Sequence, residues 1–114
     1  MSYKTLDVRV DDRGVAYVSL NRPDKRNSLS AQMIEDLTRM AGTLGADPAV
    51  RAVVLSGAGE VFCAGGDLTW MKAQIEADRA TRIREARKLA LMLNALNTMP
   101  KPLIGRIHGG AFGG

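Results

Sequence analysis

Residues 52–68 read Ala-Val-Val-Leu-Ser-Gly-Ala-Gly-Glu-Val-Phe-Cys-Ala-Gly-Gly-Asp-Leu, and they predict a buried strand, a glycine-rich turn and the start of a helix in that order. The uninterrupted apolar run over 52–56 is typical of a strand buried on both faces of a parallel sheet. A second short strand is expected at 61–63. The paired glycines that follow carry backbone N–H groups that no side chain shields, so this turn is a candidate binding site for an oxyanion.

A second glycine-rich turn follows another strand-like run near the end of the sequence. Residues 103–107 predict the last strand, and Gly109-Gly110-Ala111-Phe112-Gly113-Gly114 come directly after it. Two glycine turns that follow two strands can together form an oxyanion site. The alternative interpretation of these glycines is tight packing of strand against helix.

The first half of the sequence predicts a strand pair and an amphipathic helix. Alternating residues over 6–10, a turn at Asp12-Arg13-Gly14 and a second run over 15–20 indicate the two strands. A polar loop with a proline leads to Ser30, which can cap the helix. The apolar stripe of that helix consists of Met33, Ile34, Leu37, Met40, Ala41 and Leu44, with Gly45 and Pro48 expected to end it.

A further helix is predicted between the two glycine turns. Its apolar residues are spaced to pack on a core, and they are Ile83, Ala86, Leu89, Ala90, Leu93, Leu96 and Met99. Pro100 and Pro102 then break the helical pattern. Strands that alternate with helices indicate an α/β fold with parallel pairing, in which ligands collect at the carboxyl ends of the strands.

Composition narrows the class of protein. The 114 residues are 46% hydrophobic, and no apolar run approaches the length of about 18 residues that a membrane span needs. No secretory or transit signal is evident at the start, so a cytoplasmic location is expected. The single cysteine cannot form an internal disulfide or a zinc site, and no metal is expected. The net charge of +4 favours anionic ligands in general.

The positive charge is concentrated in one helical segment. Its basic residues are Arg79, Arg82, Arg84, Arg87 and Lys88. No aromatic residues alternate with them to stack on bases, so we interpret the segment as a solvent-exposed helix face and expect no nucleic-acid partner.

Several other functional patterns are disfavoured. Gly57-Ala58-Gly59 lacks the third glycine and the following helix of a dinucleotide loop, and the sequence contains no Gly-Lys-Ser/Thr phosphate loop. His108 lacks a partner nucleophile, so a structural role is expected, and Cys63 is expected in the core. The acidic residues do not mark a general acid and base pair. For Asp67, helix capping is favoured over a role in a substrate loop.

At three places the chain resembles the crotonase family, also called the enoyl-CoA hydratase/isomerase superfamily. The matching stretches are Leu20-Asn21-Arg22-Pro23-Asp24-Lys25-Arg26-Asn27-Ser28-Leu29, then 62–68, then 101–114 beginning Lys-Pro-Leu-Ile-Gly. The resemblance as a whole extends over essentially the whole chain. The resemblance implies that residues 1–114 are the N-terminal part of a crotonase-like α/β domain, an incomplete spiral of ββα units. It also implies an enzyme of fatty acid metabolism.

The resemblance also implies a role for individual residues. The backbone N–H groups of Gly66 and Gly114 would form the catalytic oxyanion hole for an acyl-CoA thioester, which is a substrate, so no separate cofactor is expected. The remaining substrate-binding residues would be Lys25, Arg26, Ala64, Gly65, Asp67 and Leu68. Among them, Lys25 and Arg26 would meet the CoA phosphates, the Ala64 carbonyl would accept from the adenine amino group, and Leu68 would help wall the acyl channel. Gly66 stands where the family usually has alanine.

What the sequence lacks relative to the family limits the function of the isolated chain. The two catalytic glutamates of the hydratases would lie beyond Gly114, as would the rest of the spiral core and the helical region through which such proteins form trimers and hexamers. The resemblance thus implies an enoyl-CoA hydratase fragment that is inactive alone. Enoyl-CoA isomerase or other crotonase-type chemistry, and a non-catalytic interaction module, stay open as alternatives. Trp70-Met71 resembles the methylglutaconyl-CoA hydratase branch.

Overall fold

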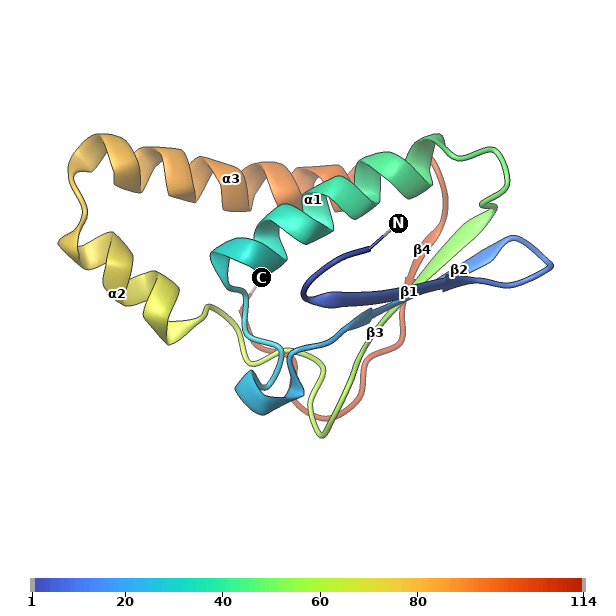
Figure 1. Cartoon of the computed structure of the whole chain (residues 1–114), viewed down its shortest axis with the longest axis horizontal. Helices are drawn as coiled ribbons and strands as arrows, with labels where there is room; N and C mark the ends of the chain where they lie inside the picture. Colours follow the sequence, from blue (N-terminus) through green and yellow to red (C-terminus); the bar gives the residue numbers. More distant parts are fainter. Residues whose placement is uncertain (1, 114) are drawn as a thin grey trace.

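The computed structural model describes residues 2–113, which form a four-stranded sheet with helices packed against it (Figure 1). The strands are β1 (Leu6–Val10), β2 (Val15–Leu20), β3 (Ala52–Gly57) and β4 (Leu103–Gly105), in the spatial order β1-β2-β3-β4. The helices are α1 (Ala31–Ala46), α2 (Leu68–Glu76) and α3 (Arg79–Asn97), and a short 3₁₀ turn covers Pro23–Lys25.

The sheet combines one antiparallel pair with two parallel pairs. β1 and β2 form the predicted hairpin, with Val8 opposite Val18. β2 pairs with β3, and β3 with β4, in the parallel sense. A parallel neighbour requires a crossover, and α1 supplies the first crossover while α2 and α3 supply the second. The carboxyl ends of β2, β3 and β4 therefore lie at one edge of the sheet, where the predicted site residues follow.

Burial in α1 matches the predicted stripe. Ser30 accepts a hydrogen bond from the Met33 amide at 3.2 Å and caps the helix, and all six stripe residues are buried. The helix ends at Ala46, one residue beyond Gly45, which lies inside it. Lys101 then stabilises the end of the helix, because its Nζ donates to the carbonyls of Leu44, at 2.8 Å, and of Asp47.

The core lies between the sheet and the long helices. Alternate residues of β2, namely Ala16, Val18 and Leu20, point into this core, and Met33, Met40 and Leu44 of α1 complete its centre. α1 and α3 lie together above the sheet (Figure 1). The predicted burial of 52–56 on both faces is wrong for the described residues: only Val53 of β3 is buried, because the long helices cover a single face of the sheet.

The predicted stripe of α3 is only partly correct. Leu89, Leu93 and Leu96 pack against the core as expected. Ile83 is 55% exposed, and Ala86 and Ala90 are exposed as well. The buried residue of the helix is Met92, which the pattern did not include. The first half of α3 extends with α2 beyond the sheet, so its apolar residues have little to pack on (Figure 1). The helix therefore contributes to the core mainly through its second half.

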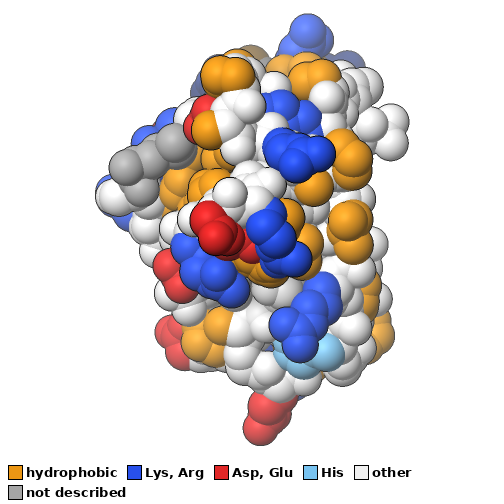
Figure 2. All heavy atoms as spheres, turned by 90° about the vertical axis from the view of Figure 1, so that its right-hand side faces the viewer, with side chains coloured by type: hydrophobic (Ala, Val, Ile, Leu, Met, Phe, Trp, Pro, Cys, Tyr) orange, Lys and Arg blue, Asp and Glu red, His pale blue; other side chains and the backbone are white. Residues whose placement is uncertain are grey.

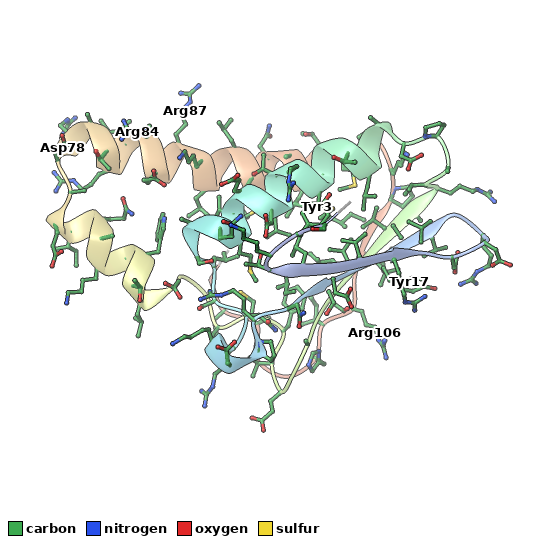
Figure 3. All side chains as sticks on the ribbon, in the orientation of Figure 1. Tyr3, Tyr17, Asp78, Arg84, Arg87 and Arg106 are labelled. Atoms are coloured by element: carbon green, nitrogen blue, oxygen red, sulfur yellow. The ribbon has the colours of Figure 1, made fainter. Side chains whose placement is uncertain are left out.

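The basic residues of α3 are exposed, as the sequence predicted. Arg79, Arg82, Arg84, Arg87 and Lys88 all lie on the surface. Figure 3 shows Arg84 and Arg87 directed away from the body of the molecule. Seen from the right-hand side of Figure 1, the surface carries hydrophobic side chains among those of Lys and Arg (Figure 2). Three large exposed side chains, Ile104, Ile107 and Phe112, belong to β4 and the turn that follows it.

One predicted strand is shorter than expected and another is not formed. β4 ends at Gly105, so residues 106 and 107 are not part of the strand. Residues 61–63 form no regular strand; Cys63 makes a single parallel bridge to Ala111. The Arg106 amide still donates to the Leu55 carbonyl of β3 at 2.8 Å, and the chain then leaves the sheet, so that residues 108–112 bond to residues 62–63 instead of extending a strand.

Candidate active site

The two glycine-rich turns lie side by side beyond the carboxyl ends of β3 and β4. The amide of Cys63 donates to the carbonyl of Gly110 at 3.3 Å, and the amide of Phe112 donates to the carbonyl of Cys63 at 3.0 Å. A Cβ atom placed on Gly113 would lie 3.5 Å from the Cα of Gly65. The two turns therefore lie next to each other as far as Gly113, the last described residue. Gly114, the predicted second donor of the oxyanion hole, lies outside the described residues.

Close approach of backbone to backbone explains why the second turn needs glycine. Gly109 has a φ of +60°, and a Cβ atom there would lie 2.3 Å from the carbonyl oxygen of Glu60. A side chain at this position is therefore excluded both by conformation and by space. The packing interpretation of the glycines and the oxyanion interpretation are compatible, because close packing is what brings the turns together.

Gly66 presents its backbone amide away from the loop that holds it. The Leu29 amide donates to the Gly65 carbonyl at 2.8 Å, and the Asp67 amide donates to the Leu29 carbonyl at 3.1 Å. In this parallel bridge Gly66 is opposite Leu29, and because N–H groups alternate in direction along an extended segment, the Gly66 N–H points to the other side. The geometry leaves this amide directed away from the bridge, as an oxyanion donor requires.

Most of the predicted substrate-binding residues line one hollow of about 630 Å³. Its walls include Lys25, Arg26, Ala64, Gly66, Asp67 and Leu68, together with Asp24, Ser28, Thr69 and Met71. Gly65 is the exception: it is buried behind the hollow, with a φ of +99°. The structure thus brings the basic loop that follows β2 and the first glycine turn into a single site. Leu68, at 79% exposed, forms its outer rim.

Lys25 and Arg26 are placed by a tight loop. Pro23–Lys25 form one 3₁₀ turn, and Arg26 and Asn27 both have positive φ angles, of 52° and 56°. The carbonyl of Arg26 accepts from the Ala64 amide at 2.9 Å. The side chains of Lys25 and Arg26 therefore lie next to the glycine turn, and their charges would attract a phosphate group to this side of the site.

Asn27 is a structural residue of the site whose role the sequence interpretation missed. It is fully buried, and its Oδ1 accepts from the Arg22 amide at 2.8 Å. Its Nδ2 donates to the carbonyls of Ala58, at 2.8 Å, and Val61, at 3.2 Å. One side chain thus joins the loop after β2 to the loop after β3. The sequence feature that could have indicated this role is an asparagine in a polar loop, because asparagine tolerates a left-handed backbone.

Asp67 caps α2, as predicted. Its Oδ2 accepts from the Trp70 amide at 3.0 Å, and its Oδ1 accepts from the Ser28 hydroxyl at 3.0 Å. Arg22 lies 3.4 Å from the same Oδ1. Burial acts to raise the pKa of Asp67, but these hydrogen bonds and the charge of Arg22 together hold the pKa below its usual value. Asp67 is therefore a carboxylate whose oxygens are already engaged within the protein.

A smaller apolar hollow of about 150 Å³ lies beside the second turn. Phe62, Leu96 and Phe112 line it, and further walls come from Leu20, Leu29, Leu37, Leu55, Cys63, Met92, Leu93, Ala111 and Gly113. The site therefore has a charged region near Lys25 and an apolar region near Phe112, with the glycine turns between them.

His108 and Cys63 have the structural roles that were predicted for them. The Nε2 of His108 lies 2.8 Å from the Gly59 carbonyl, on the surface. Cys63 is buried, and its thiol donates to the Asn27 carbonyl at 3.1 Å. Neither residue lines the hollow that contains Lys25 and Gly66, and Cys63 contributes only to a wall of the apolar hollow.

Comparison with known proteins identifies the family. The enoyl-CoA hydratase/isomerase family matches residues 11–114. The chain belongs to this family. Hydroxycinnamoyl-CoA hydratase-lyase of Pseudomonas fluorescens is 36% identical over 98% of the chain and 41% of its own length. The human mitochondrial Delta(3,5)-Delta(2,4)-dienoyl-CoA isomerase is 35% identical over 99% of the chain and 37% of its own length.

Solved structures of the family share the fold. Enoyl-CoA hydratase of Mycobacterium smegmatis superposes with a TM-score of 0.85 at 40% identity, over 92% of this chain and 40% of that one. The family resemblance and the crotonase-like α/β fold that the sequence predicted are thereby confirmed. The chain spans about 40% of the length of these relatives. Within residues 2–113, no helix has the length and apolar character that a membrane crossing demands.

Proposed function

We propose that residues 1–114 are the N-terminal part of an acyl-CoA-binding enzyme, and that the complete enzyme is an enoyl-CoA hydratase that adds water to a 2-enoyl-CoA. The observation that carries the proposal is the common hollow of Lys25, Arg26, Ala64 and Gly66. It joins a cationic region, suited to the CoA phosphates, to an outward-directed backbone amide, suited to a thioester carbonyl. Family membership supports the same substrate class.

The proposed role of the chain is to stabilise the enolate. As water adds to the β-carbon, electrons move through the conjugated system onto the thioester oxygen. The amides of Gly66 and Gly114 would donate hydrogen bonds to that oxygen, and a lost donor of this kind typically costs about 3 kcal/mol of barrier. The enolate then takes a proton at the α-carbon. The acid and base for these steps would come from residues beyond this chain, so the 114 residues alone would be inactive.

The other proposed substrate contacts pair charged or polar parts of the acyl-CoA with polar residues, and its apolar part with apolar residues. Lys25 and Arg26 would bind the phosphates, and the Ala64 carbonyl would accept from the adenine amino group. Leu68 would border the acyl group, and the apolar hollow beside Phe112 could accommodate the part of that group nearest the turns. Gly65 would contribute to the site only through the backbone conformation of the turn. Asp67 would not contact the substrate itself, and would affect binding by holding the turn in its conformation. We propose no cofactor besides the CoA thioester itself.

Enoyl-CoA isomerase is the second candidate, because one relative that matches 99% of the chain is named a dienoyl-CoA isomerase. The same oxyanion hole would serve it, with a different acid and base.

A non-catalytic role is a third candidate: β4 pairs only with β3 among the described strands, and such an edge can pair with another chain or another copy. In the complete enzyme we expect trimers or hexamers, formed with other copies.

Calorimetry tests the proposal. A 2-enoyl-CoA is titrated into the longest form of the protein that the gene encodes, and into K25M and R26M variants. Each variant is expected to bind the thioester about tenfold more weakly, because a charge-assisted phosphate contact is lost. An R82M variant, which removes an equally basic but distant residue of α3, is the control and should bind like the unmodified protein. Absence of binding by the unmodified protein would refute the proposal.

A turnover assay separates the two enzyme candidates. Hydration removes the conjugated double bond of a 2-enoyl-CoA and consumes water, whereas isomerisation moves a double bond and incorporates no solvent oxygen. Mass spectrometry of the product formed in ¹⁸O-labelled water is expected to show one added water. A product of unchanged mass would favour the isomerase.

A further inference from the structure

A largely buried ion pair between Arg22 and Asp67, whose side chains are 20% and 11% exposed, connects the loop after β2 with the first glycine turn. We infer that Arg22 is a positioning residue: acting through Asp67, it fixes the direction of the Gly66 amide and thereby the polarisation of the bound thioester carbonyl. This inference rests on the function proposed above. Nothing in it requires Arg22 to touch the substrate.

The need for a positioning residue arises from the turn itself. Gly65 and Gly66 are consecutive glycines, and neither has a side chain that restricts its backbone. An oxyanion donor is effective only when its direction is fixed before the charge develops. The direction of the Gly66 amide must therefore be imposed by neighbouring segments.

Contacts on both sides of Gly66 supply that constraint. On one side, the Gly65 carbonyl accepts from the Leu29 amide at 2.8 Å. On the other, Asp67 is held through its own amide, at 3.1 Å from the Leu29 carbonyl, and through both oxygens of its carboxylate. The Gly66 N–H belongs to the same planar peptide group as the Gly65 carbonyl, so the bond from Leu29 orients it directly. The contacts of Asp67 hold the chain on the other side of Gly66 and so limit how far this peptide can rotate.

Arg22 holds this arrangement together from the opposite loop. Its Nη1 donates to the Ser28 carbonyl at 2.7 Å and lies 3.3 Å from the Ser28 hydroxyl. Nη1 and Nη2 both lie 3.4 Å from the Asp67 Oδ1. The Arg22 side chain is 20% exposed and that of Asp67 is 11% exposed, so solvent screens the pair weakly. Arg22 therefore fixes Ser28 and Asp67 as one unit.

Removal of the guanidinium should separate two functions of the site. Lys25 and Arg26 stay in place to bind the CoA phosphates, whereas the Gly66 amide keeps the Leu29–Gly65 bond and loses the support that Arg22 gives through Asp67. We expect the contact with the thioester carbonyl to weaken while the contact with the nucleotide part of CoA persists. A general loss of structure would instead weaken both contacts.

The experiment compares two ligands in the longest form of the protein that the gene encodes. One ligand is a conjugated 2-enoyl-CoA, whose absorption band moves to longer wavelength when donors polarise its carbonyl; the other is CoA without an acyl group. The variants are R22M, R22K and D67N. D67N retains an oxygen that can cap the helix, but it removes the charge and replaces the other accepting oxygen by an NH2 group, so it tests the same contact from the partner's side if R22M does not fold. Circular dichroism verifies the fold of each variant.

The matched control is R13M. Arg13 forms an ion pair of the same kind with Asp11 at 2.8 Å, but that pair is exposed and lies at the turn between β1 and β2. Its removal should leave both ligands and the absorption shift unchanged.

R22M and D67N are expected to bind the enoyl-CoA about five- to tenfold more weakly, with an absorption shift reduced by about half or more, while the affinity for CoA changes less than about twofold. R22K should fall between R22M and the unmodified protein. Equal weakening of both ligands, or an unchanged absorption shift in R22M and D67N, would overturn the inference alone. Failure of the unmodified protein to bind either ligand would overturn the proposed function instead.

Discussion

Substitution of Asn27 by alanine should destabilise the protein more than any change at a surface position. Asn27 is fully buried and adopts a left-handed backbone with a φ of 56°. Its amide group forms three hydrogen bonds, one within the loop after β2 and two that join this loop to the loop after β3. Alanine removes all three bonds and also tolerates the left-handed conformation less well than asparagine does.

The size of the effect follows from these losses. The part-buried amide of Arg22 loses its acceptor, which costs about 1–3 kcal/mol, and the carbonyls of Ala58 and Val61 lose donors at about 1 kcal/mol each. The left-handed backbone adds about 1–2 kcal/mol for alanine. We therefore expect N27A to lower the free energy of unfolding by about 4–7 kcal/mol, which is a large part of the 5–15 kcal/mol typical of a domain.

Equilibrium unfolding in urea, followed by circular dichroism, measures this change. N27G separates the two contributions, because glycine restores the freedom of the backbone without restoring the hydrogen bonds; we expect it to be about 0.5–1 kcal/mol less destabilised than N27A. N94A, at an exposed position of α3, is the control and should change the free energy by less than about 0.5 kcal/mol. A cost below about 1.5 kcal/mol for N27A would refute the reasoning.

Two further predictions concern pH and backbone geometry. Burial acts to raise the pKa of Asp36, but hydrogen bonds from Thr5 and Gln32 and the charge of Arg39 lower it overall. Because the folded pKa lies below the unfolded value of about 3.9, Asp36 stabilises the fold above that pH, and this stabilisation is lost as the pH falls through the folded pKa. D36N should therefore flatten the decline of the urea midpoint below about pH 5; an unchanged decline would contradict this explanation. G109A should destabilise the protein by about 2 kcal/mol or more, since its Cβ would lie 2.3 Å from the Glu60 carbonyl oxygen, and a thermal midpoint equal to that of the unmodified protein would contradict it.

Local patterns in the sequence were sufficient for the elements that need only local information. The α1 stripe and the caps at Ser30 and Asp67 were predicted because helix periodicity and capping depend on neighbouring residues. The hairpin of β1 and β2 was predicted for the same reason. Errors occurred where burial depends on distant segments: Met92 is buried and Ile83 exposed, although both are apolar residues of one helix.

The site shows the same division. The family resemblance identified the residues of the hollow around Gly66, but it assigned no role to Asn27 or Arg22. Their partners, Ala58, Val61 and Asp67, are more than thirty residues away along the chain. No spacing rule connects residues at such separations. Their contacts exist only after the strands have paired and brought the loops to one edge of the sheet.

The sequence by itself determined the order of strands and helices, the parallel α/β class and the glycine positions from which an oxyanion site is expected, because these depend on periodicity and on backbone chemistry. Only the tertiary structure decided that the turns at Cys63 and Ala111 pair with each other and that Asn27 and Arg22 hold the surrounding loops. The physical reason is that these contacts join residues distant in sequence, and their energies are realised only when parallel strand pairing places the loops within hydrogen-bonding distance.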